Sequence, residues 1–77
     1  MREFEIRLRS VQEVQDFVDL ATTKPFTVLV CDDFRQVNGK SFMEMFCLHV
    51  AGALYAVVDC ADAELAFLKQ ELARFLA

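Results

Sequence analysis

Hydrophobic and polar residues alternate strictly at the start of the chain. From Glu3 to Arg9, the apolar residues Phe4, Ile6 and Leu8 fall on one side and charged residues fall on the other. A period of two is typical of a strand that buries one face. The pattern therefore predicts a strand over residues 3–9.

The spacing then changes to that of a helix. Apolar residues recur three or four positions apart, at Val11, Val14, Phe17, Val18 and Ala21. Ser10 and Glu13 stand where a capping box places a serine and a glutamate, which accept hydrogen bonds from the amides of the first turn. A helix from about Val11 to Thr22 is predicted.

Two strands are predicted in the middle of the chain, on either side of a turn. Lys24-Pro25 ends the first helix, and the run from Phe26 to Cys31 is apolar and β-branched enough for a central strand. Asp32-Asp33 favours a turn. Residues 34–37 then return as a short antiparallel strand.

A second capping box begins the next helix. After the turn at Asn38-Gly39, Ser41 and Glu44 repeat the pattern of Ser10 and Glu13, which predicts a short helix to about His49. Ala51-Gly52 ends that helix.

The chain closes with a strand and a helix. Residues 54–58 are apolar and predict the strand, and Asp59 suits a helix N-cap. An apolar stripe marks the last helix, at Leu65, Leu68, Leu72 and Phe75 or Leu76.

The element order is therefore β-α-β-β-α-β-α. Because four strands must cover one apolar face, we expect an α+β fold, an open-faced two-layer sandwich in which three helices cover one face of a four-stranded antiparallel sheet. A chain of 77 residues that is 56% hydrophobic and has 2 Gly and 1 Pro is expected to form one domain, 1–77, without linkers.

The charge and hydropathy of the chain limit the kinds of partner that we expect. The 8 basic and 12 acidic residues leave a net charge of −4, which opposes nucleic acid and anionic membrane surfaces. No apolar run approaches the roughly 20 residues of a membrane span. Residues 1–5 alternate in charge, unlike the apolar centre of a signal peptide, so we expect a cytoplasmic protein.

The sequence carries no pattern for independent enzymatic activity. Cys31, Cys47 and Cys60 lack a C-x-x-C spacing, which favours buried free thiols over a disulfide or a zinc site. We find no convergent carboxylate pair, Ser-His-Asp set, glycine-rich phosphate loop or metal-ligand cluster. No metal and no cofactor are expected.

One segment carries a family resemblance. Residues 37–43 read V-N-G-K-S-F-M. Together with Phe17-Val18 upstream and the element order, this segment resembles HPr, the histidine-containing phosphocarrier family of the bacterial sugar phosphotransferase system, whose members commonly read V-N-A-K-S-I-M. The resemblance implies the HPr-like fold.

The resemblance also exposes a missing group. The family motif G-L-H-A-R-P-A should lie at the start of the first helix, where ungapped placement puts Ser10 at its histidine, Gln12 at its arginine and Glu13 at its proline. Phosphotransfer needs an imidazole that accepts and releases phosphate. We therefore expect no classical histidine phosphotransfer. His49, the one histidine, is expected to be a surface or capping residue.

Two serines are phosphorylation candidates. In the resembling family the serine at the position of Ser41 is phosphorylated by a dedicated kinase in many Gram-positive bacteria. The other interpretation is an ordinary N-cap, which Ser41 with Glu44 fits. Ser10 is the second candidate, although a phosphoserine ester is too stable to pass its phosphate on.

The resemblance further implies a protein-docking surface on the first and second helices, and it places Gln12, Phe42, Met43 and Phe46 there. The alternative is that the aromatic residues belong to the core. The polar side of the first helix is acidic, whereas the family usually has basic residues there. This difference favours a different or a basic partner over the usual enzymes of the phosphotransferase system. The alternative is that the polar side of this helix is a plain solvated face.

Three functions follow as alternatives. The leading hypothesis is a non-catalytic HPr-like binding or regulatory module. Ser41 is the candidate point of its regulation. The second is a phosphocarrier with a non-standard acceptor, Ser10 or His49. The third is an assembly subunit in which an edge strand or the second-helix residues pair two copies. The sequence leaves the partner and the oligomeric state open.

Overall fold

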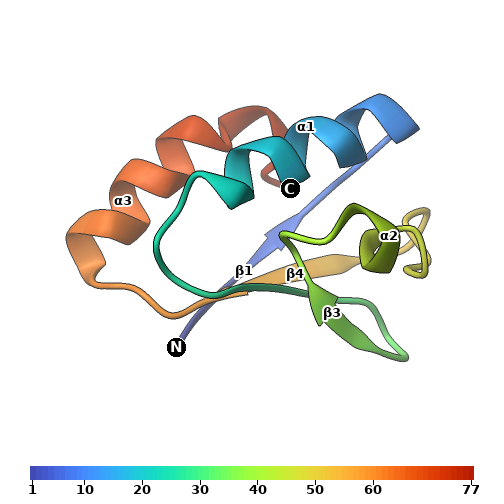
Figure 1. The fold of residues 1–77 in the computed structure, drawn as a ribbon, viewed down its shortest axis with the longest axis horizontal. Helices are drawn as coiled ribbons and strands as arrows, with labels where there is room; N and C mark the ends of the chain where they lie inside the picture. The colour runs from blue at the N-terminus through green and yellow to red at the C-terminus, as the bar shows by residue number, and fades with distance from the viewer.

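The structure is a computed structural model that describes residues 1–77. In chain order its elements are β1 (Arg2–Ile6), α1 (Val11–Thr22), β2 (Val28–Cys31), β3 (Gln36–Asn38), α2 (Phe42–Met45), β4 (Leu54–Val58) and α3 (Asp62–Glu71), followed by a 3-10 helix (Ala73–Phe75). Figure 1 shows α1 and α3 side by side over the sheet and α2 near the start of α1. The predicted α+β fold and element order are confirmed.

All four strands form one antiparallel sheet in the order β1-β4-β2-β3. The register aligns one residue from each strand in a row across the sheet, Phe4, Ala56, Val30 and Val37. All four are buried, because alternate residues of a strand point to the same face.

The helices cover this face and complete a single core of 18 buried apolar residues. Phe17 of α1 and Phe75 of the 3-10 helix meet edge to face, with ring centroids 6.1 Å apart. Both rings are almost fully buried, so their contact packs the end of the chain against the first helix. No helix has the length and apolarity needed to span a membrane.

β1 is shorter than predicted because the end of the chain pairs with it. The alternation predicted a strand to Arg9, but the ladder with β4 ends at Ile6. Beyond that point the N–H of Arg7 donates to the carbonyl of Phe75 at 2.6 Å, and Ile6 forms an isolated bridge with Leu76. The C-terminal residues therefore cover the outer edge of β1.

Local hydrogen bonds also shift the bounds of β2, β3 and α3. β2 begins at Val28, two residues later than predicted, and β3 covers residues 36–38 because the Asp32 carboxylate holds the amides of Phe34 and Arg35 in the turn. Asp59 is not the N-cap of α3, since its N–H donates to Thr27 and prolongs the sheet.

The turn after β3 needs a glycine for reasons of space. The N–H of Gly39 donates to the carbonyl of Val28 at 2.8 Å. A Cβ at Gly39 would lie 2.9 Å from Val28 Cγ1 and 3.1 Å from that carbonyl oxygen. Glycine therefore lets the turn approach β2 closely and sets the starting point of α2.

Candidate functional site

Ser10 caps α1 as predicted. Its Oγ accepts a hydrogen bond from the N–H of Glu13 at 3.1 Å. The carboxylate of Glu13 accepts from the N–H of Arg9, at 2.8 Å, rather than from Ser10, so the capping box is displaced by one residue. The next residue, Val11, leaves 62% of its surface exposed at the start of the helix.

An arginine distant in the sequence lies on the polar face of α1. The Gln12 amide donates to Asp16 Oδ1 at 2.9 Å, and the guanidinium of Arg74 donates to Asp16 Oδ2. The hydrogen bond from Gln12 and then that from Arg74 lower the pKa of Asp16. Asp16 lies on the polar face of α1 as predicted, and Arg74 compensates its charge.

α2 ends earlier than predicted, and a backbone hydrogen bond holds the residues after it against the loop that follows β2. The helix ends at Met45, whereas the pattern predicted a helix to about His49. The N–H of His49 donates to Oδ2 of Asp32 at 2.8 Å instead of to a helical carbonyl. His49 consequently lies exposed in a turn after α2, and the prediction that it ends the helix is wrong.

Asp32 ties this turn to the turn between β2 and β3. Besides the amide of His49, its carboxylate accepts from the amides of Phe34 at 2.7 Å and Arg35 at 2.8 Å. These backbone hydrogen bonds, that from His49 first, lower the pKa of Asp32. The ionised carboxylate therefore holds two loops together.

Ser41 is the N-cap of α2. Its Oγ accepts from the N–H of Glu44 at 3.3 Å. The carboxylate of Glu44 reaches past the cap and accepts from the N–H of Asn38 at 3.1 Å. The capping interpretation of Ser41 is confirmed, and the Ser41 side chain stays partly accessible.

The structure brings the predicted second-helix residues together, and we call Phe42, Met43 and Phe46 the α2 patch. Phe42 is half-buried against the core and meets the ring of Phe46 edge to face, with centroids 4.5 Å apart. Met43 is 81% exposed and Phe46 is 51% exposed. The alternative that these residues are simply core therefore holds in part for Phe42 alone.

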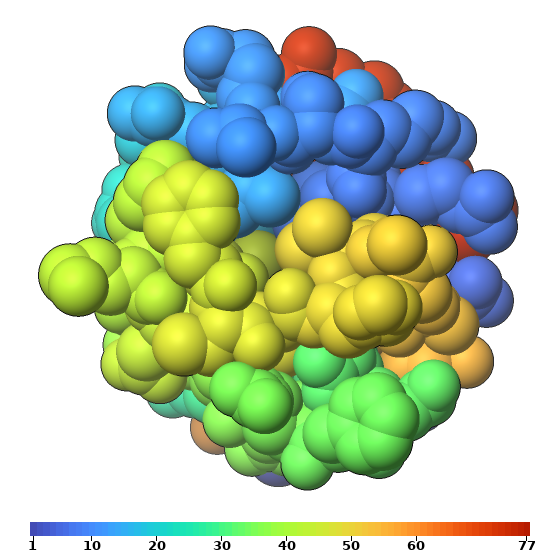
Figure 2. Space-filling view, turned by 90° about the vertical axis from the view of Figure 1, so that its right-hand side faces the viewer, coloured from blue at the N-terminus to red at the C-terminus, as the bar shows by residue number.

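Two further exposed apolar residues lie on elements that share a face with α2. Figure 2 shows the start of α1, α2 with the turns after it, and the β2–β3 turn on one face. Val11, at the start of α1, is 62% exposed, and Phe34, in the β2–β3 turn, is 81% exposed. Sequence reasoning placed neither residue on this surface, because the β2–β3 turn carries no helical or strand periodicity to mark it.

Comparison with known proteins bears on this arrangement. No protein-family model and no curated protein matches the chain. Among solved structures it is similar to HPr-C-His from Thermoanaerobacter tengcongensis, at 24% sequence identity and a TM-score of 0.73, over 88% of this chain and 84% of that one. It is also similar to the phosphocarrier protein HPr from Bacillus anthracis strain Ames, at 21% identity and a TM-score of 0.74, over 99% of this chain and 94% of that one.

The fold is HPr-like. At these identities the likeness concerns the arrangement of the elements. In this HPr-like fold the predicted site residues occupy two neighbouring helix starts: Ser10 and Gln12 on α1, and Ser41, Phe42 and Met43 on α2, with Phe46 directly after it. α1 and α2 are in contact, so the two helices that carry the predicted residues lie next to each other.

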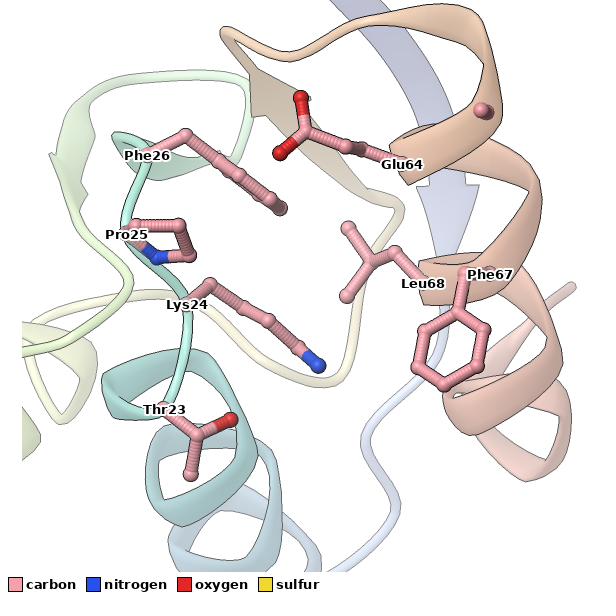
Figure 3. A pocket seen from close by; sticks show the side chains of 8 residues that line it. Thr23, Lys24, Pro25, Phe26, Glu64, Phe67 and Leu68 are labelled. Atoms are coloured by element: carbon pink, nitrogen blue, oxygen red, sulfur yellow. The ribbon is translucent and has the colours of Figure 1, made fainter.

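The HPr-like fold also has a hollow that none of these residues lines. It measures about 370 Å³ and lies between the α1–β2 connection and α3. In Figure 3, Phe26 and Leu68 point into it from opposite walls, and Lys24 extends toward Phe67. The Lys24 amino group is already bound to the carboxylate of Glu71, so the one cation of this hollow is occupied.

All three cysteines are free, but they are less buried than predicted. Cys31 and Cys60 are partly buried, and burial raises the pKa of both thiols. Cys47 is exposed next to Phe46, so the prediction of a buried thiol is wrong there. The structure brings together no group of three or more potential metal ligands.

Proposed function

We propose that this chain is a non-catalytic HPr-like binding or regulatory module that docks a protein through α1 and α2. The exposure of the α2 patch carries the proposal. Met43 and Phe46 leave 81% and 51% of their surfaces exposed, while Phe42 fixes Phe46 to the core. Adjacent exposed large apolar side chains are typical of a surface that a partner covers.

The residue at the helix start supports docking without histidine phosphotransfer. The resemblance assigns the phosphorylated position to Ser10, which has a hydroxyl in place of an imidazole. That hydroxyl already accepts the hydrogen bond from Glu13 that begins α1. A partner would therefore recognise the shape of this surface and not a phosphohistidine.

Ser41 is the proposed point of regulation. Its Oγ accepts from the amide of Glu44, and Glu44 in turn holds the amide of Asn38. A phosphate on Ser41 would add about two negative charges beside the Glu44 carboxylate and compete for the same amides. The turn before α2 would then rearrange and move the α2 patch, which changes binding.

A binding experiment tests the docking surface. We would titrate the ¹⁵N-labelled chain with two purified probes, the enzyme that phosphorylates HPr from phosphoenolpyruvate and the kinase that modifies the HPr serine. The proposal expects saturable shifts for residues of α2 and the start of α1. Phe46→Asp should abolish them and Phe67→Asp should not, because Phe67 is also exposed, at 62%, but lies on α3. If neither probe shifts any residue of α2, the proposed docking to these proteins fails.

A mass measurement tests the regulation. Incubation with ATP and the serine kinase should add one phosphate, and Ser41→Ala should prevent it while Ser10→Ala does not. Both serines are helix N-caps, so the second variant controls for the loss of a cap. Addition of phosphate from phosphoenolpyruvate, labile in acid and lost in His49→Gln, would replace this proposal with a phosphocarrier.

The exposed apolar residues also fit a second candidate function, that of an assembly subunit. Besides the α2 patch, Val11 and Phe34 expose apolar side chains, which a second copy of the chain could cover. Sedimentation distinguishes the two functions. A tight dimer that Phe46→Asp dissociates would favour assembly, and a monomer at high concentration would favour a different protein partner.

A further inference from the structure

A second hollow, next to the start of α1, has the chemistry of an anion site. It measures about 480 Å³ and lies between residues 5–9, at the end of β1, and residues 50–53, before β4. Figure 2 shows the two segments next to each other, in blue and yellow. Arg7 and Arg9 line the first wall, so we call it the Arg7–Arg9 hollow.

The two arginines differ from most other cations of the chain. Arg2, Lys24 and Arg74 form ion pairs with carboxylates, the Lys40 amino group donates to a backbone carbonyl, and Lys69 lies over the ring of Phe4. The guanidinium of Arg7 makes no hydrogen bond or ion pair, and among the other arginines only Arg35 shares this property. Arg9 has a single long contact, 3.9 Å to the Glu13 carboxylate.

The Glu13 contact leaves most of the Arg9 guanidinium free. The Glu13 oxygen in question, Oε1, already accepts from the backbone N–H of Arg9 at the shorter distance of 2.8 Å. The Arg9 side chain is 56% exposed. Two planar groups with unused N–H donors therefore line one hollow, and planar guanidinium groups match the paired oxygens of carboxylate and phosphate.

The opposite wall, residues 50–53, adds backbone donors and a partly buried apolar residue, Val50. The N–H groups of Ala51 and Ala53 donate to no acceptor in the protein. Leu8 lines the first wall, although its side chain belongs to the core. Glu5 contributes one carboxylate, so two arginines and one glutamate leave the lining with one net positive charge in a chain whose net charge is −4.

We propose that the Arg7–Arg9 hollow binds a small oxyanion, a carboxylate or a phosphate. Arg7 supplies the paired N–H donors, Arg9 adds the second positive charge, and the 50–53 segment completes the cradle with its free amides. The apolar part of the lining accommodates a short hydrocarbon body, which suits an organic acid or a phosphorylated small molecule.

The test is an NMR titration of the full chain at low ionic strength with inorganic phosphate, with succinate and, as a control for ionic strength, with chloride. We expect saturable shifts at Ala51, Ala53 and the Arg7 side chain with at least one of the first two anions. Preference for phosphate or for succinate identifies the source of the oxyanion. Absence of saturable shifts, or equal shifts with chloride, overturns the proposal.

A matched pair of variants completes the test. Arg7→Gln should weaken binding at least tenfold, whereas Arg35→Gln should leave it unchanged, because Arg35 is equally unpaired but lies in the β2–β3 turn. Equal losses in both variants would mean that net charge alone attracts the anion, which contradicts a built site. The ¹⁵N spectrum of each variant reports whether the fold is kept.

Discussion

The guanidinium of Arg74 donates to the carboxylate of Asp16, although the two residues lie 58 positions apart in the chain. This ion pair joins the last 3-10 helix to the middle of α1, the helix that begins the proposed docking surface. It also sets the charge that a partner would meet, because Asp16 lies on the polar face of α1 with Gln12.

The contacts of Asp16 can be tested by measuring its pKa. Gln12→Ala and Arg74→Gln should each raise the pKa of Asp16 toward its ordinary value, because the hydrogen bond from Gln12 is the largest single cause of the lowered pKa and Arg74 lowers it through both a hydrogen bond and its charge. Carboxyl NMR titration measures both shifts. Arg35→Gln is the control for the loss of one positive charge. A pKa of Asp16 that stays unchanged in both variants would contradict the geometry.

Asp32 should make stability depend on acid. Its pKa is lowered in the fold, so its contribution is complete above the ordinary pKa of 3.8 and disappears as the pH falls through the lower pKa of the folded protein. Asp32→Ala should therefore lower the midpoint of thermal unfolding by several degrees at neutral pH and by progressively less in acid. Asp33→Ala should change little at either pH, since the side chain of Asp33 is exposed.

The amide of His49 gives a local readout of the same contact. In Asp32→Ala this N–H loses its acceptor and should exchange with solvent faster, as should nearby amides of the turn after α2. Hydrogen exchange measures the change. Unaltered exchange at His49 would show that the turn is held by other contacts.

Gly39 should resist substitution by alanine, the residue that the resembling family commonly carries there. A Cβ 2.9 Å from Val28 Cγ1 and 3.1 Å from a backbone oxygen forces the turn away from β2. We expect a loss of about 1–3 kcal/mol in the free energy of unfolding, measured by urea denaturation.

Gly52→Ala is the matched control for Gly39→Ala. There the nearest atom to an added Cβ is Cδ2 of the exposed His49 ring, at 3.2 Å, and that ring can move. The loss of stability should be smaller. A Gly39→Ala protein as stable as the parent would show that the turn adjusts freely.

The α2 patch should separate into an anchor and an exposed residue. Phe42→Ala removes a half-buried ring that packs on the core and on Phe46, and should cost about 1–3 kcal/mol of unfolding free energy. Met43→Ala removes a side chain that is 81% exposed and should change the free energy by less than about 0.5 kcal/mol. Equal costs would contradict the assigned burial.

The local pattern of apolar and polar residues predicted the helices and strands, because this pattern repeats within a few residues in each element. The alternation at residues 3–9 and the helical spacing of α1 depend only on neighbouring positions, and both elements exist. The end of α2 could not be predicted in this way. It is decided by the hydrogen bond from His49 to Asp32, whose partners are 17 positions apart, and no periodicity marks such a pair.

In the candidate site, too, features set by neighbouring residues could be predicted and features set by distant residues could not. The capping boxes identified Ser10 and Ser41, because a cap acts within one helical turn. The spacing of Phe42, Met43 and Phe46 could not show which ring faces the core, since that depends on how α2 approaches α1 and β3. Arg74 was missed because only the folded chain brings it to α1.

The pairing of Leu76 with Ile6 has a consequence for how molecules of this protein can misassemble. An uncovered strand edge is a template on which another chain can add a strand, as in amyloid growth. Residues 75–77 cover that edge beside residues 5–7, with Ala77 donating to the carbonyl of Glu5 at 3.4 Å. The opposite edge offers only the three residues of β3, so little uncovered backbone is left on which another chain could add a strand.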